Sequence, residues 1–442
     1  MALGMGMAMG PYYRLRWFAA QGLPRFALRA AARRGDTLSR LTTDPSALED
    51  PYPLIESLRA QGRMVRSSLA WVTTDHELCR TILRDNRFGT RAAEGFDIPR
   101  PLVRIARRAA LPPNPMEPPS MLVIDPPEHS RMRRPVASAF TPRAIARLQD
   151  RVESITEELL DGLPAGRETD LVTGFAAQVP IAIISRMLGF PEEARDQFLD
   201  WGDRMTPLLD IGLSWPVWRD AIVAIGEMDR YADEHLARLR REPGEDILSS
   251  LVAAGELGDR ELKATASLLM GAGFETTVNL IGNGIVQLLS HPDQLARLRA
   301  EPDLWPNAVE EVLRLDAPVQ STARVVVAEG AEIGGVRLRR GATVVVSLAG
   351  ANRDPNVFPE PDRFDVGRAN AKEHLTFSTG IHACVGASLA RMEATHALRA
   401  LFERFPDLRL SGAPERRPLF TLHGYSRLPV ALGRRAEQSS VV

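Results

Sequence analysis

The sequence predicts a mainly α-helical protein with a small β region, that is, an α+β fold. Apolar residues recur at helical spacing along most of the chain from Asp50 onwards, and the longest such run covers residues 262–289. Short segments rich in β-branched residues gather at residues 322–327, 333–338 and 344–348. A length of 442 residues would allow several domains, but large single domains are common, and we expect one catalytic domain over residues 45–442.

The composition describes an ordinary globular chain and excludes some classes of partner. Hydrophobic residues make up 44% and charged residues 25%, which is ample material for a core. A net charge of −1 gives no reason to expect nucleic acid as a partner. Two cysteines cannot build a disulfide framework, so the reducing cytoplasm is the expected compartment.

Residues 1–44 form a basic N-terminal extension in which the first acidic residue is Asp36. Its uncharged run ends at Tyr13, short of the roughly 20 apolar residues that a membrane-spanning helix needs. No basic segment precedes an apolar stretch, so a secretory signal is not expected. A disordered tail leading into a surface helix is the favoured interpretation. The alternative is an amphipathic basic helix that lies on an anionic membrane surface.

The first half of the chain reads as helices with one hairpin and one long irregular stretch. Residues 64–66 and 70–72 predict the hairpin, and Asp75 caps a helix on which Cys79 is most simply a core residue. Residues 86–119 are irregular and rich in proline. A helix then begins near residue 125, and Pro135 should kink it or end it early. Further helices are expected over residues 174–190, 192–210 and 217–241, and the apolar stretch 205–217 is either a mobile lid or plain core.

The centre of the longest apolar run is unusual for a structural helix. It reads Gly271-Ala272-Gly273-Phe274-Glu275-Thr276-Thr277. Two glycines cost about 1 kcal/mol each against alanine in a helix interior, and β-branched threonines add strain. We therefore expect that the backbone needs room here for a flat cofactor close to Ala272 and Gly273. Thr276 is placed to bond back to a carbonyl one turn earlier and open the helix.

The second unusual segment, residues 377–391, surrounds Cys384. Cys384 lies between Gly380 and Gly386, just before a helical pattern, where the helix dipole favours a thiolate. Both glycines would let the loop backbone approach closely. An inert buried cysteine is the plain alternative. A zinc site built on His382 and Cys384 is set aside, since Cys79 stands alone and structural zinc needs paired ligands.

Together, Phe377, Gly380, His382, Cys384, Gly386 and the Gly-Phe-Glu-Thr segment resemble the cytochrome P-450 monooxygenases. The resemblance covers about residues 45–432 and is greatest to a bacterial, actinobacterial (mycobacterial-type) subfamily. It implies a haem b held between the long central helix and the cysteine loop, with Cys384 as the thiolate ligand of its iron. Phe377 would pack near the sulfur. The haem propionates would meet the basic residues His129, Arg133, Arg324 and His382.

The same resemblance assigns further roles. Thr276 would donate a hydrogen bond to iron-bound dioxygen and order the water that delivers protons. Glu275 would relay those protons from solvent. Glu311 and Arg314 at i and i+3, completed by Arg363, would hold the cysteine loop in a structural role, although the neighbouring Glu310 would pair outward. The substrate pocket would be lined by Phe96, Ile98, Leu268, Leu269, Val319, Gln320 and His423.

The implied reaction is insertion of one oxygen atom from O2 into a hydrophobic molecule such as a lipid, steroid, terpenoid or polyketide. No flavin or nicotinamide segment is found, so electrons would come from a separate ferredoxin or flavodoxin-type partner docking near Arg131, Arg134 and Arg391. We expect a monomer. Peroxide-driven oxidation and a non-enzymatic haem gas sensor or carrier are the alternatives, and both leave the Glu275–Thr276 pair without a purpose.

Overall fold

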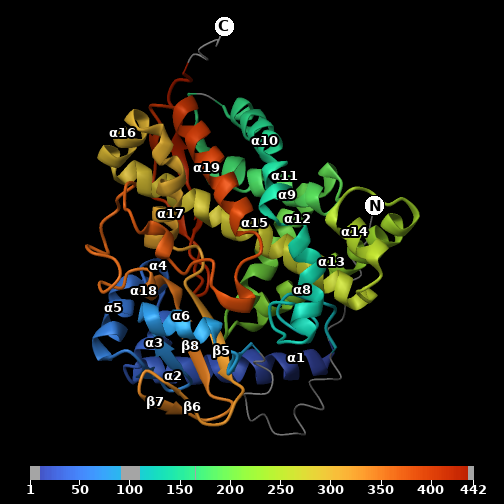
Figure 1. Ribbon diagram of the computed structural model, residues 1–442, viewed down its shortest axis with the longest axis vertical. Coiled ribbons are helices and arrows are strands. Elements are labelled where there is room, and N and C mark those ends of the chain that lie inside the picture. The colour runs from blue at the N-terminus through green and yellow to red at the C-terminus, as the bar shows by residue number, and fades with distance from the viewer. Residues whose placement is uncertain (1–9, 91–109, 165, 437–442) are drawn as a thin grey trace.

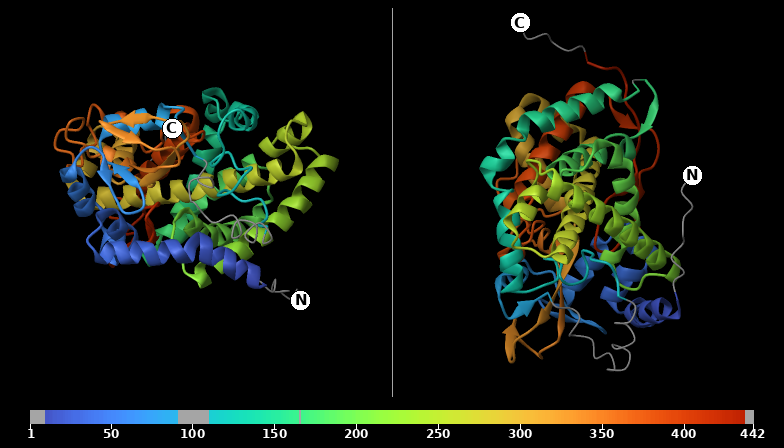
Figure 2. Two further views of the ribbon diagram at one scale, coloured as in Figure 1. Left: turned by 90° about the horizontal axis from the view of Figure 1, so that it is seen from below. Right: turned by 90° about the vertical axis from the view of Figure 1, so that its right-hand side faces the viewer.

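The computed structural model describes residues 10–90, 110–164 and 166–436. Helices dominate it and short strands gather mainly at one end, so the expected mainly α fold with a small β region is confirmed (Figure 1). The early helices are α1 (Pro11–Trp17), α2 (Leu23–Arg33), α3 (Thr37–Thr43), α4 (Pro45–Glu49), α5 (Tyr52–Gln61) and α6 (His76–Arg84). The π-helical turn η1 (Phe18–Gly22) joins α1 to α2, and Figure 2 shows this run along one edge of the molecule.

The remaining helices build the larger part of the molecule. They are α8 (Glu128–Ser138), α9 (Pro142–Ala146), α10 (Gln149–Gly162), α11 (Gln178–Met187), α12 (Arg195–Met205), α13 (Trp215–Arg241), α14 (Ile247–Ala254), α15 (Asp259–Ser290), α16 (Pro292–Ala300), α17 (Trp305–Leu315), α18 (Leu348–Ala351) and α19 (Ala387–Arg404). Short connecting turns include η3 (Val172–Ala176), η4 (Glu192–Ala194), η5 (Thr206–Leu209), η6 (Pro302–Leu304), η7 (Ala371–Glu373) and η8 (Gly380–His382).

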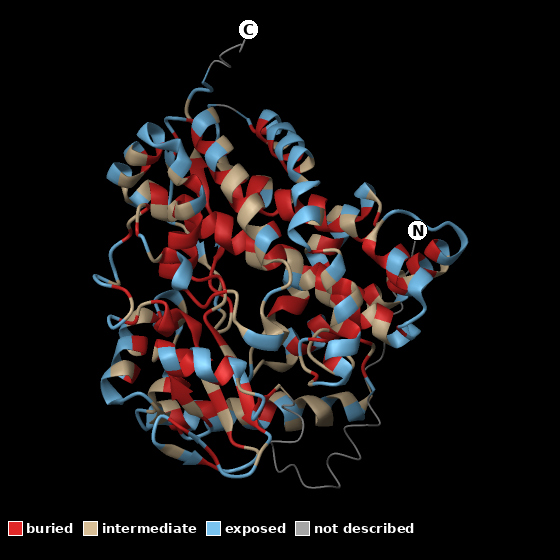
Figure 3. Cartoon of the chain, in the orientation of Figure 1, coloured by how far each residue is buried: buried red, intermediate tan, exposed pale blue. Residues whose placement is uncertain are grey.

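Helix α15 runs through the centre and organises the core. Its 32 residues span about 48 Å at 1.5 Å per residue. It packs against α11, α12, α17 and α19, and Figure 3 shows it mostly buried. A helix that is apolar on most of its faces is stable only when neighbours cover it. The largest apolar cluster of the described residues therefore includes side chains of α15, and smaller clusters lie beneath the main sheet and among α3 to α5.

The main sheet has the strand order β1-β2-β8-β5-β3. Its strands are β1 (Val65–Arg66), β2 (Trp71–Thr73), β8 (Thr343–Ser347), β5 (Ser321–Val326) and β3 (Phe88–Gly89). The predicted hairpin is confirmed, with Val65 opposite Val72. The parallel pairing of β2 with β8 sets Trp71 opposite Val344, so the sheet joins the two ends of the chain. Smaller sheets are β4 (Glu168–Asp170) with β12 (Pro429–Ala431) and β9 (Arg409–Leu410), and β10 (Glu415–Arg416) with β11 (Tyr425–Arg427).

Three local predictions were wrong. Residues 333–338 form no single strand, because Gly334 and Gly335 both have positive φ and turn the chain between β6 (Ala331–Ile333) and β7 (Val336–Leu338). Of the two effects expected of Pro135, the early end of the helix was wrong, since α8 continues to Ser138 at the cost of one backbone donor, and the kink stays a prediction. Phe88 and Gly89 were expected to be irregular, but they pair with Val326 and Val325 of β5. Because these partners lie far along the chain, no local pattern predicts the strand.

For the stretch between α12 and α13 the sequence left two interpretations open, a mobile lid and plain core packing. Leu208, Leu213 and Trp215 are partly buried and pack on the core. Ile211 between them is exposed. The backbone of Gly212 and Leu213 is held by the Gln21 side-chain oxygen, which accepts their N–H groups at 2.7 Å and 3.1 Å. This segment is therefore tied to the N-terminal helices.

Candidate functional site

The middle of α15 exposes two small residues on one face. Ala272 is exposed and Thr276, four residues later, is half-buried. The Thr276 hydroxyl donates to the Ala272 carbonyl at 3.0 Å, as predicted, yet the helix runs through this point without interruption. Gly273 faces elsewhere: a Cβ there would lie 3.0 Å from Cγ1 of Ile184 on α11. The expectation that Gly273 makes room for a cofactor was therefore wrong, because its missing side chain admits a neighbouring helix.

Glu275 is buried in the same turn and is incompletely satisfied. It is 4% exposed, and its Oε1 lies 3.4 Å from Nε of Arg417 without a hydrogen bond. Burial raises the pKa of Glu275, and the Arg417 guanidinium only partly opposes this effect. Arg417 also donates to Asp203 on α12, whose side chain is largely exposed. A buried acid is thus connected through one arginine to the protein surface, and nothing local in the sequence pointed to Arg417.

The loop before α19 presents Cys384 beside a tight backbone contact. The Cys384 N–H donates to the Phe377 carbonyl at 2.8 Å. Gly380 has φ +76°, and a Cβ there would collide with the Leu83 carbonyl of α6, so this position requires glycine. Gly386 differs, since a Cβ would meet only Phe140 at 3.9 Å. No described protein atom therefore requires glycine at Gly386, and close approach to a bound group stays a prediction there.

The Cys384 side chain is exposed at the surface of this loop, but the protein around it does not by itself favour a thiolate. Desolvation raises the pKa of Cys384, while the Gly386 N–H, Arg133 and Arg391 act in the opposite direction. The helix-dipole argument made from the sequence was therefore insufficient. A coordinated metal ion deprotonates a thiol outright, so a thiolate here calls for a metal rather than for a stronger dipole.

Next to this loop lies a basic cluster formed by His129, Arg133, Arg324 and His382. The His129 and His382 rings are 4.2 Å apart, and both ring nitrogens of His129 and Nε2 of His382 are buried without a hydrogen-bond partner. Arg133 donates to the Ala383 carbonyl of the cysteine loop. His129 and Arg133 share one face of α8, whereas Arg324 lies on β5 and His382 on η8.

The charges and unpartnered donors of this cluster favour the binding of an anion. Burial lowers the pKa of Arg324 to about 10, and within the described part of the chain its guanidinium donates only to the Thr322 hydroxyl and the Ala323 carbonyl. Burial and then the neighbouring His129 and Arg324 lower the pKa of His382 to about 3. The nearest carboxylate is Asp125, whose Oδ1 is 4.0 Å from Nε2 of His382 and accepts from Thr90. Buried cations and unpartnered donors on this scale are stable when acidic groups neutralise them.

The predicted structural triad is built from a different arginine. Glu311 accepts two hydrogen bonds from Arg314, at 2.7 Å and 2.8 Å. The third cation is Arg368, whose Nε donates to Glu311 at 3.1 Å. Arg363 was the wrong choice: its side chain is exposed and pairs with Glu360, and only its carbonyl joins the network. Four residues lie between the two arginines, and only the path of the irregular loop decides which one turns inward.

Glu310 does not pair outward as expected. It is buried and pairs with His374 at 3.0 Å and with Arg391 at 2.8 Å. The Arg391 guanidinium also lies 4.5 Å from the centre of the Phe377 ring. Two adjacent acids thus hold the segment before the cysteine loop from one helix, α17, and Phe377 is fixed both by its carbonyl bond to Cys384 and by Arg391.

The predicted substrate residues are divided by the structure. Leu268 is half-buried and shares a helix face with Ala272 and Thr276, whereas Leu269 is buried in the core. Val319 is half-buried and bridges to Leu422. Phe96 and Ile98 lie outside the described residues. His423 does not project toward Thr276: it is buried with its ring 6.2 Å from that of Tyr52 and with Nε2 3.4 Å from Asp316.

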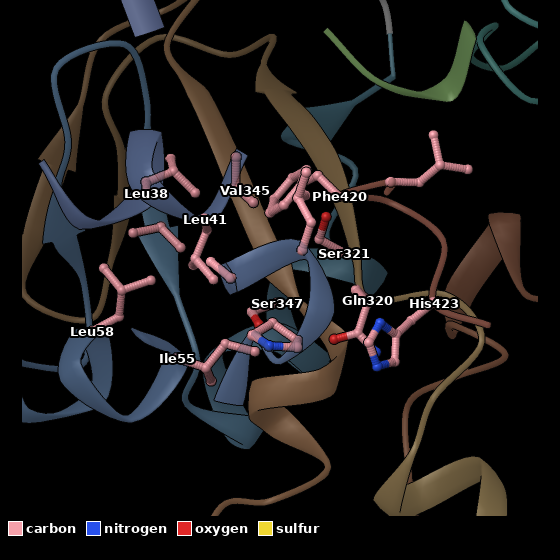
Figure 4. Close-up of a pocket in the computed structure, with 15 residues that line it drawn as sticks. Leu38, Leu41, Ile55, Leu58, Gln320, Ser321, Val345, Ser347, Phe420 and His423 are labelled. Carbon is pink, nitrogen blue, oxygen red and sulfur yellow. The ribbon is translucent and has the colours of Figure 1, made fainter. Parts of the chain in front are cut away.

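Gln320 is also turned away from the cysteine loop. Its amide donates to the Ala317 carbonyl at 2.7 Å. Together with His423 it borders a small apolar pocket between the N-terminal helices and the main sheet, shown in Figure 4 with Leu38, Leu41, Ile55, Leu58 and Phe420. Neither Thr276 nor Cys384 lines this pocket. Gln320 and His423 therefore belong to the packing around it. They lie on two segments that pair, since the Gln320 N–H donates to the Thr421 carbonyl at 2.8 Å and the His423 N–H to the Pro318 carbonyl at 2.9 Å.

Zinc finds no support at the cysteine loop. Cys79 is buried on α6, with its thiol 3.6 Å from the Thr73 carbonyl. Over residues 10–90, 110–164 and 166–436, no three histidine, cysteine or acidic side chains cluster as metal ligands. In the same residues, no helix is both long enough and apolar enough to cross a membrane.

Comparison with known proteins identifies the family that this geometry indicates. The family model for cytochrome P450 matches residues 114–424. Putative cytochrome P450 140 of Mycobacterium tuberculosis is 44% identical over 95% of this chain and 98% of its own length. Cytochrome P450 monooxygenase PikC of Streptomyces venezuelae is 40% identical over 86% of this chain and 91% of its own. The crystal structure of P450BioI with an acyl carrier protein has a TM-score of 0.80, with 34% identity, covering 88% of this chain and all of that one.

The fold and the site thus define a haem-thiolate enzyme, and the chain belongs to the cytochrome P450 family. It is an oxidoreductase of the monooxygenase type, and the cofactor of its family is haem b. The residues present fit that group. The Cys384 thiol is accessible, Ala272 is an exposed residue of minimal bulk on α15, and the unpartnered nitrogens of His129 and His382 beside the buried Arg324 suit two propionate carboxylates.

Proposed function

We propose that this protein inserts one oxygen atom of O2 into an apolar small molecule, with electrons from a separate ferredoxin or flavodoxin-type protein. The observation that carries this proposal is the Glu275–Thr276 pair on α15. A buried acid with a raised pKa precedes a half-buried hydroxyl in the same turn of α15. Proton delivery is a task that oxygen insertion requires and that gas binding does not.

The cofactor contacts follow from the same geometry. Cys384 would ligate the iron, and His129, Arg133, Arg324 and His382 would hold the propionates. When bound, the haem would activate dioxygen, so that one oxygen atom of O2 enters the substrate and the other leaves as water, with two electrons from the partner protein and two protons. Arg133 would contribute twice, since it already donates to the Ala383 carbonyl next to the ligand. Phe377 and Gly380 position the loop rather than take part in the reaction.

The protein residues supply and hold the protons. The Thr276 hydroxyl donates its own hydrogen to the Ala272 carbonyl, so its oxygen can accept a hydrogen bond from a neighbouring donor. The Glu275 carboxyl, protonated over a wider pH range than an exposed glutamate, is the adjacent donor. Arg417 positions Glu275 toward the side of Asp203 and the solvent. Because an arginine keeps its protons, we infer that it orients the carboxylate and does not itself relay.

The substrate would lie along the face formed by Leu268, Ala272 and Thr276 and by Val319. Apolar side chains dominate this set, which favours a lipid, steroid, terpenoid or polyketide over a charged metabolite. Titration of such compounds against the haem absorption spectrum tests the class. A ligand that changes the spin state of the iron identifies it, whereas a response only to charged compounds contradicts it.

The electron donor would dock on the side of the cysteine loop. The three arginines predicted for this contact are already paired: Arg131 with Glu261, Arg134 with Glu256 and Arg391 with Glu310. An acidic partner would have to exchange the first two of these exposed pairs. We expect the double variant R131E/R134E to slow reduction by an acidic ferredoxin several-fold at low salt. An unchanged rate would remove these two residues from the contact.

We also propose that the protein acts as a cytoplasmic monomer. The low cysteine content suits a reducing compartment. Analytical ultracentrifugation of the holoprotein and fractionation of the source cells check the two statements separately.

The decisive experiment substitutes Thr276 by alanine and uses Thr277→Ala as the matched control. The Thr277 hydroxyl points to the Gly273 carbonyl at 3.4 Å on the side of α11. In T276A, product formation should fall while electron consumption and peroxide release continue; T277A should stay close to the parent. Equal product from T276A and the parent with added peroxide but no electron donor would favour the peroxide-driven reaction. A protein that binds gas but forms no product with any compound tested would be a sensor or carrier.

A further inference from the structure

Exposed apolar side chains are concentrated at one corner of the molecule. This N-terminal corner consists of α1, η1, α2 and the start of α13 with the segment before it. Of the ten large apolar residues that are exposed in the described chain, six lie here: Tyr12, Phe18, Leu23, Phe26, Ile211 and Val217. Phe26 is 63% exposed, the highest value among the ten. Single exposed apolar residues are ordinary, but a gathering of them usually marks a contact surface.

The helices of the corner are firmly attached on their inner side. Leu28 and Ala31 of α2 are buried. The Trp17 indole donates to the Leu213 carbonyl at 3.0 Å, and the Arg25 guanidinium donates to the Gly212 carbonyl at 2.8 Å. The outward position of Phe26 is therefore set by a packed helix and is not a consequence of fraying. Water contact at Phe26 is disfavoured by the hydrophobic effect, and a partner that covers it would be stabilised.

The charged residues of α1, η1 and α2 have one sign. No acidic residue occurs before Asp36 in the sequence. Arg29, Arg33 and Arg34 are exposed, and no carboxylate of the described residues pairs with them. Arg14 is exposed as well and lies over the Trp215 ring at 5.4 Å. The surface therefore combines outward aromatic and aliphatic side chains with unneutralised arginines.

This combination discriminates among possible occupants. A second copy of the chain in a two-fold dimer would bring arginines against arginines, which like-charge repulsion disfavours. An acidic protein would satisfy the arginines but leave Leu23 and Phe26 without an apolar counterpart. A bilayer with anionic headgroups offers both, since basic amphipathic helices bury their apolar residues at the acyl boundary and keep their cations among the headgroups. Aromatic residues are also enriched at that boundary.

We propose that the N-terminal corner binds the surface of an anionic lipid bilayer, with Leu23 and Phe26 inserted and Arg29 and Arg33 on the headgroups. This is peripheral contact by helices that lie in the plane of the interface. It does not depend on the proposed reaction. The corner includes the segment between α12 and α13, so a bound protein would present that side of the molecule to the lipid phase.

The test is co-sedimentation of the full-length holoprotein with vesicles of phosphatidylcholine alone and with vesicles containing phosphatidylglycerol. The parent should bind the anionic vesicles and remain in solution with the neutral ones. Phe26→Ser should lower the partition coefficient about tenfold, and the double variant R29Q/R33Q should lower it by a similar factor or more. The matched controls are Val327→Ser, an exposed apolar site elsewhere, and R143Q/R147Q on α9, which should bind like the parent.

Each variant is first checked for an unchanged absorption band of the reduced carbonyl complex, so that a folding defect is not taken for lost binding. No binding of the parent to anionic vesicles would overturn the proposal. Binding that is equally strong in F26S would overturn it as well, since charge alone would then account for it. Self-association that disappears in F26S, or capture of an acidic ferredoxin that disappears in R29Q/R33Q, without lipid binding, would assign the corner to a protein partner instead.

Discussion

Two buried glutamates in this protein show opposite arrangements. Glu311 on α17 is 0% exposed and accepts four hydrogen bonds: two from Arg314, one from Arg368 at 3.1 Å and one from the Asp365 N–H at 3.0 Å. Glu275 on α15 is almost as deeply buried, but its Oε1 has no hydrogen bond and only one cation, Arg417, lies near it. The two carboxylates share burial and differ in how completely they are satisfied.

The difference separates a structural acid from a reactive one. A carboxylate with four donors fixes the elements that carry those donors. A carboxylate with a missing donor pays for burial by binding a proton more readily, and the pKa of Glu275 is accordingly raised. Groups perturbed in this way are enriched at functional sites. The predictions below test whether this distinction holds.

The largest effect is expected for Glu311→Gln. The neutral amide would leave Arg314 and Arg368 buried without their counter-charge, and breaking a buried pair costs about 3–5 kcal/mol. We expect little or no haem-containing protein on expression, and a correspondingly lower free energy of unfolding in denaturant titrations. Glu360→Gln, at an exposed pair with Arg363, is the control and should behave like the parent. Normal stability of E311Q would mean that the network is dispensable.

Glu275→Gln should do the reverse, with folding preserved and activity reduced. The amide cannot donate a transferable proton, so turnover should fall about 100-fold, within the usual range for a lost general acid. Steady-state rates with saturating electron donor provide the measurement. Asp259→Asn, at an exposed acid in the first turn of the same helix, should leave turnover unchanged. A large loss of stability in E275Q, with turnover per folded molecule unchanged, would place Glu275 with the structural acids.

A comparison of two arginines sharpens the description of the Glu311 network. Arg368 donates to Glu311 and to the Pro359, Glu360 and Arg363 carbonyls. Lysine has one nitrogen and cannot reach all four, so Arg368→Lys should lower the free energy of unfolding by about 2 kcal/mol. Arg363→Lys, at an exposed pair, should change it by less than about 0.5 kcal/mol. Denaturant midpoints measure both, and the reverse order would restore Arg363 to the network.

The smallest effect concerns pH and a third buried acid, Asp316. Arg416 and His423 outweigh burial and hold the pKa of Asp316 at about 2, so it stays ionised above pH 4. Burial lowers the pKa of His423 to about 4. Between pH 4 and pH 6.5 the unfolded chain therefore binds a proton at His423 that the folded chain does not bind. The contribution of neutral His423 to the free energy of unfolding is complete above pH 6.5 and is lost as the pH falls toward 4. The loss should reach about 2 kcal/mol by pH 5.

The variant His423→Gln removes that contribution. Unfolding free energies measured between pH 7 and pH 4.5 should fall less steeply in H423Q than in the parent. Parallel curves for the two proteins would show that His423 is protonated in the folded state despite its burial. The other buried histidines are common to both proteins and cancel in the difference.

Local pattern was sufficient for much of the fold. The helical spacing, the Asp75 cap and the hairpin at Val65 and Val72 depend on residues close in the chain, and each was correctly predicted. Predictions failed where the deciding partner is distant. From the sequence, Gly273 was expected to make room for a ligand, but Ile184 of α11 packs against it. His423 was expected to line the substrate pocket, but Tyr52 and Asp316 lie beside its ring.

By itself the sequence determined the chemistry: a cysteine between two glycines before a helix, and an acid–alcohol pair at a strained point of the longest apolar run. Each of these motifs is short, because the residues that form it are close neighbours in the chain. Only the tertiary structure decided which buried charges are satisfied. Whether Arg363 or Arg368 reaches Glu311, and whether Arg417 approaches Glu275, depends on loops whose course is set by packing and hydrogen bonds far away in sequence. Satisfaction of a buried charge is a property of three-dimensional neighbours, and periodicity along the chain carries no record of them.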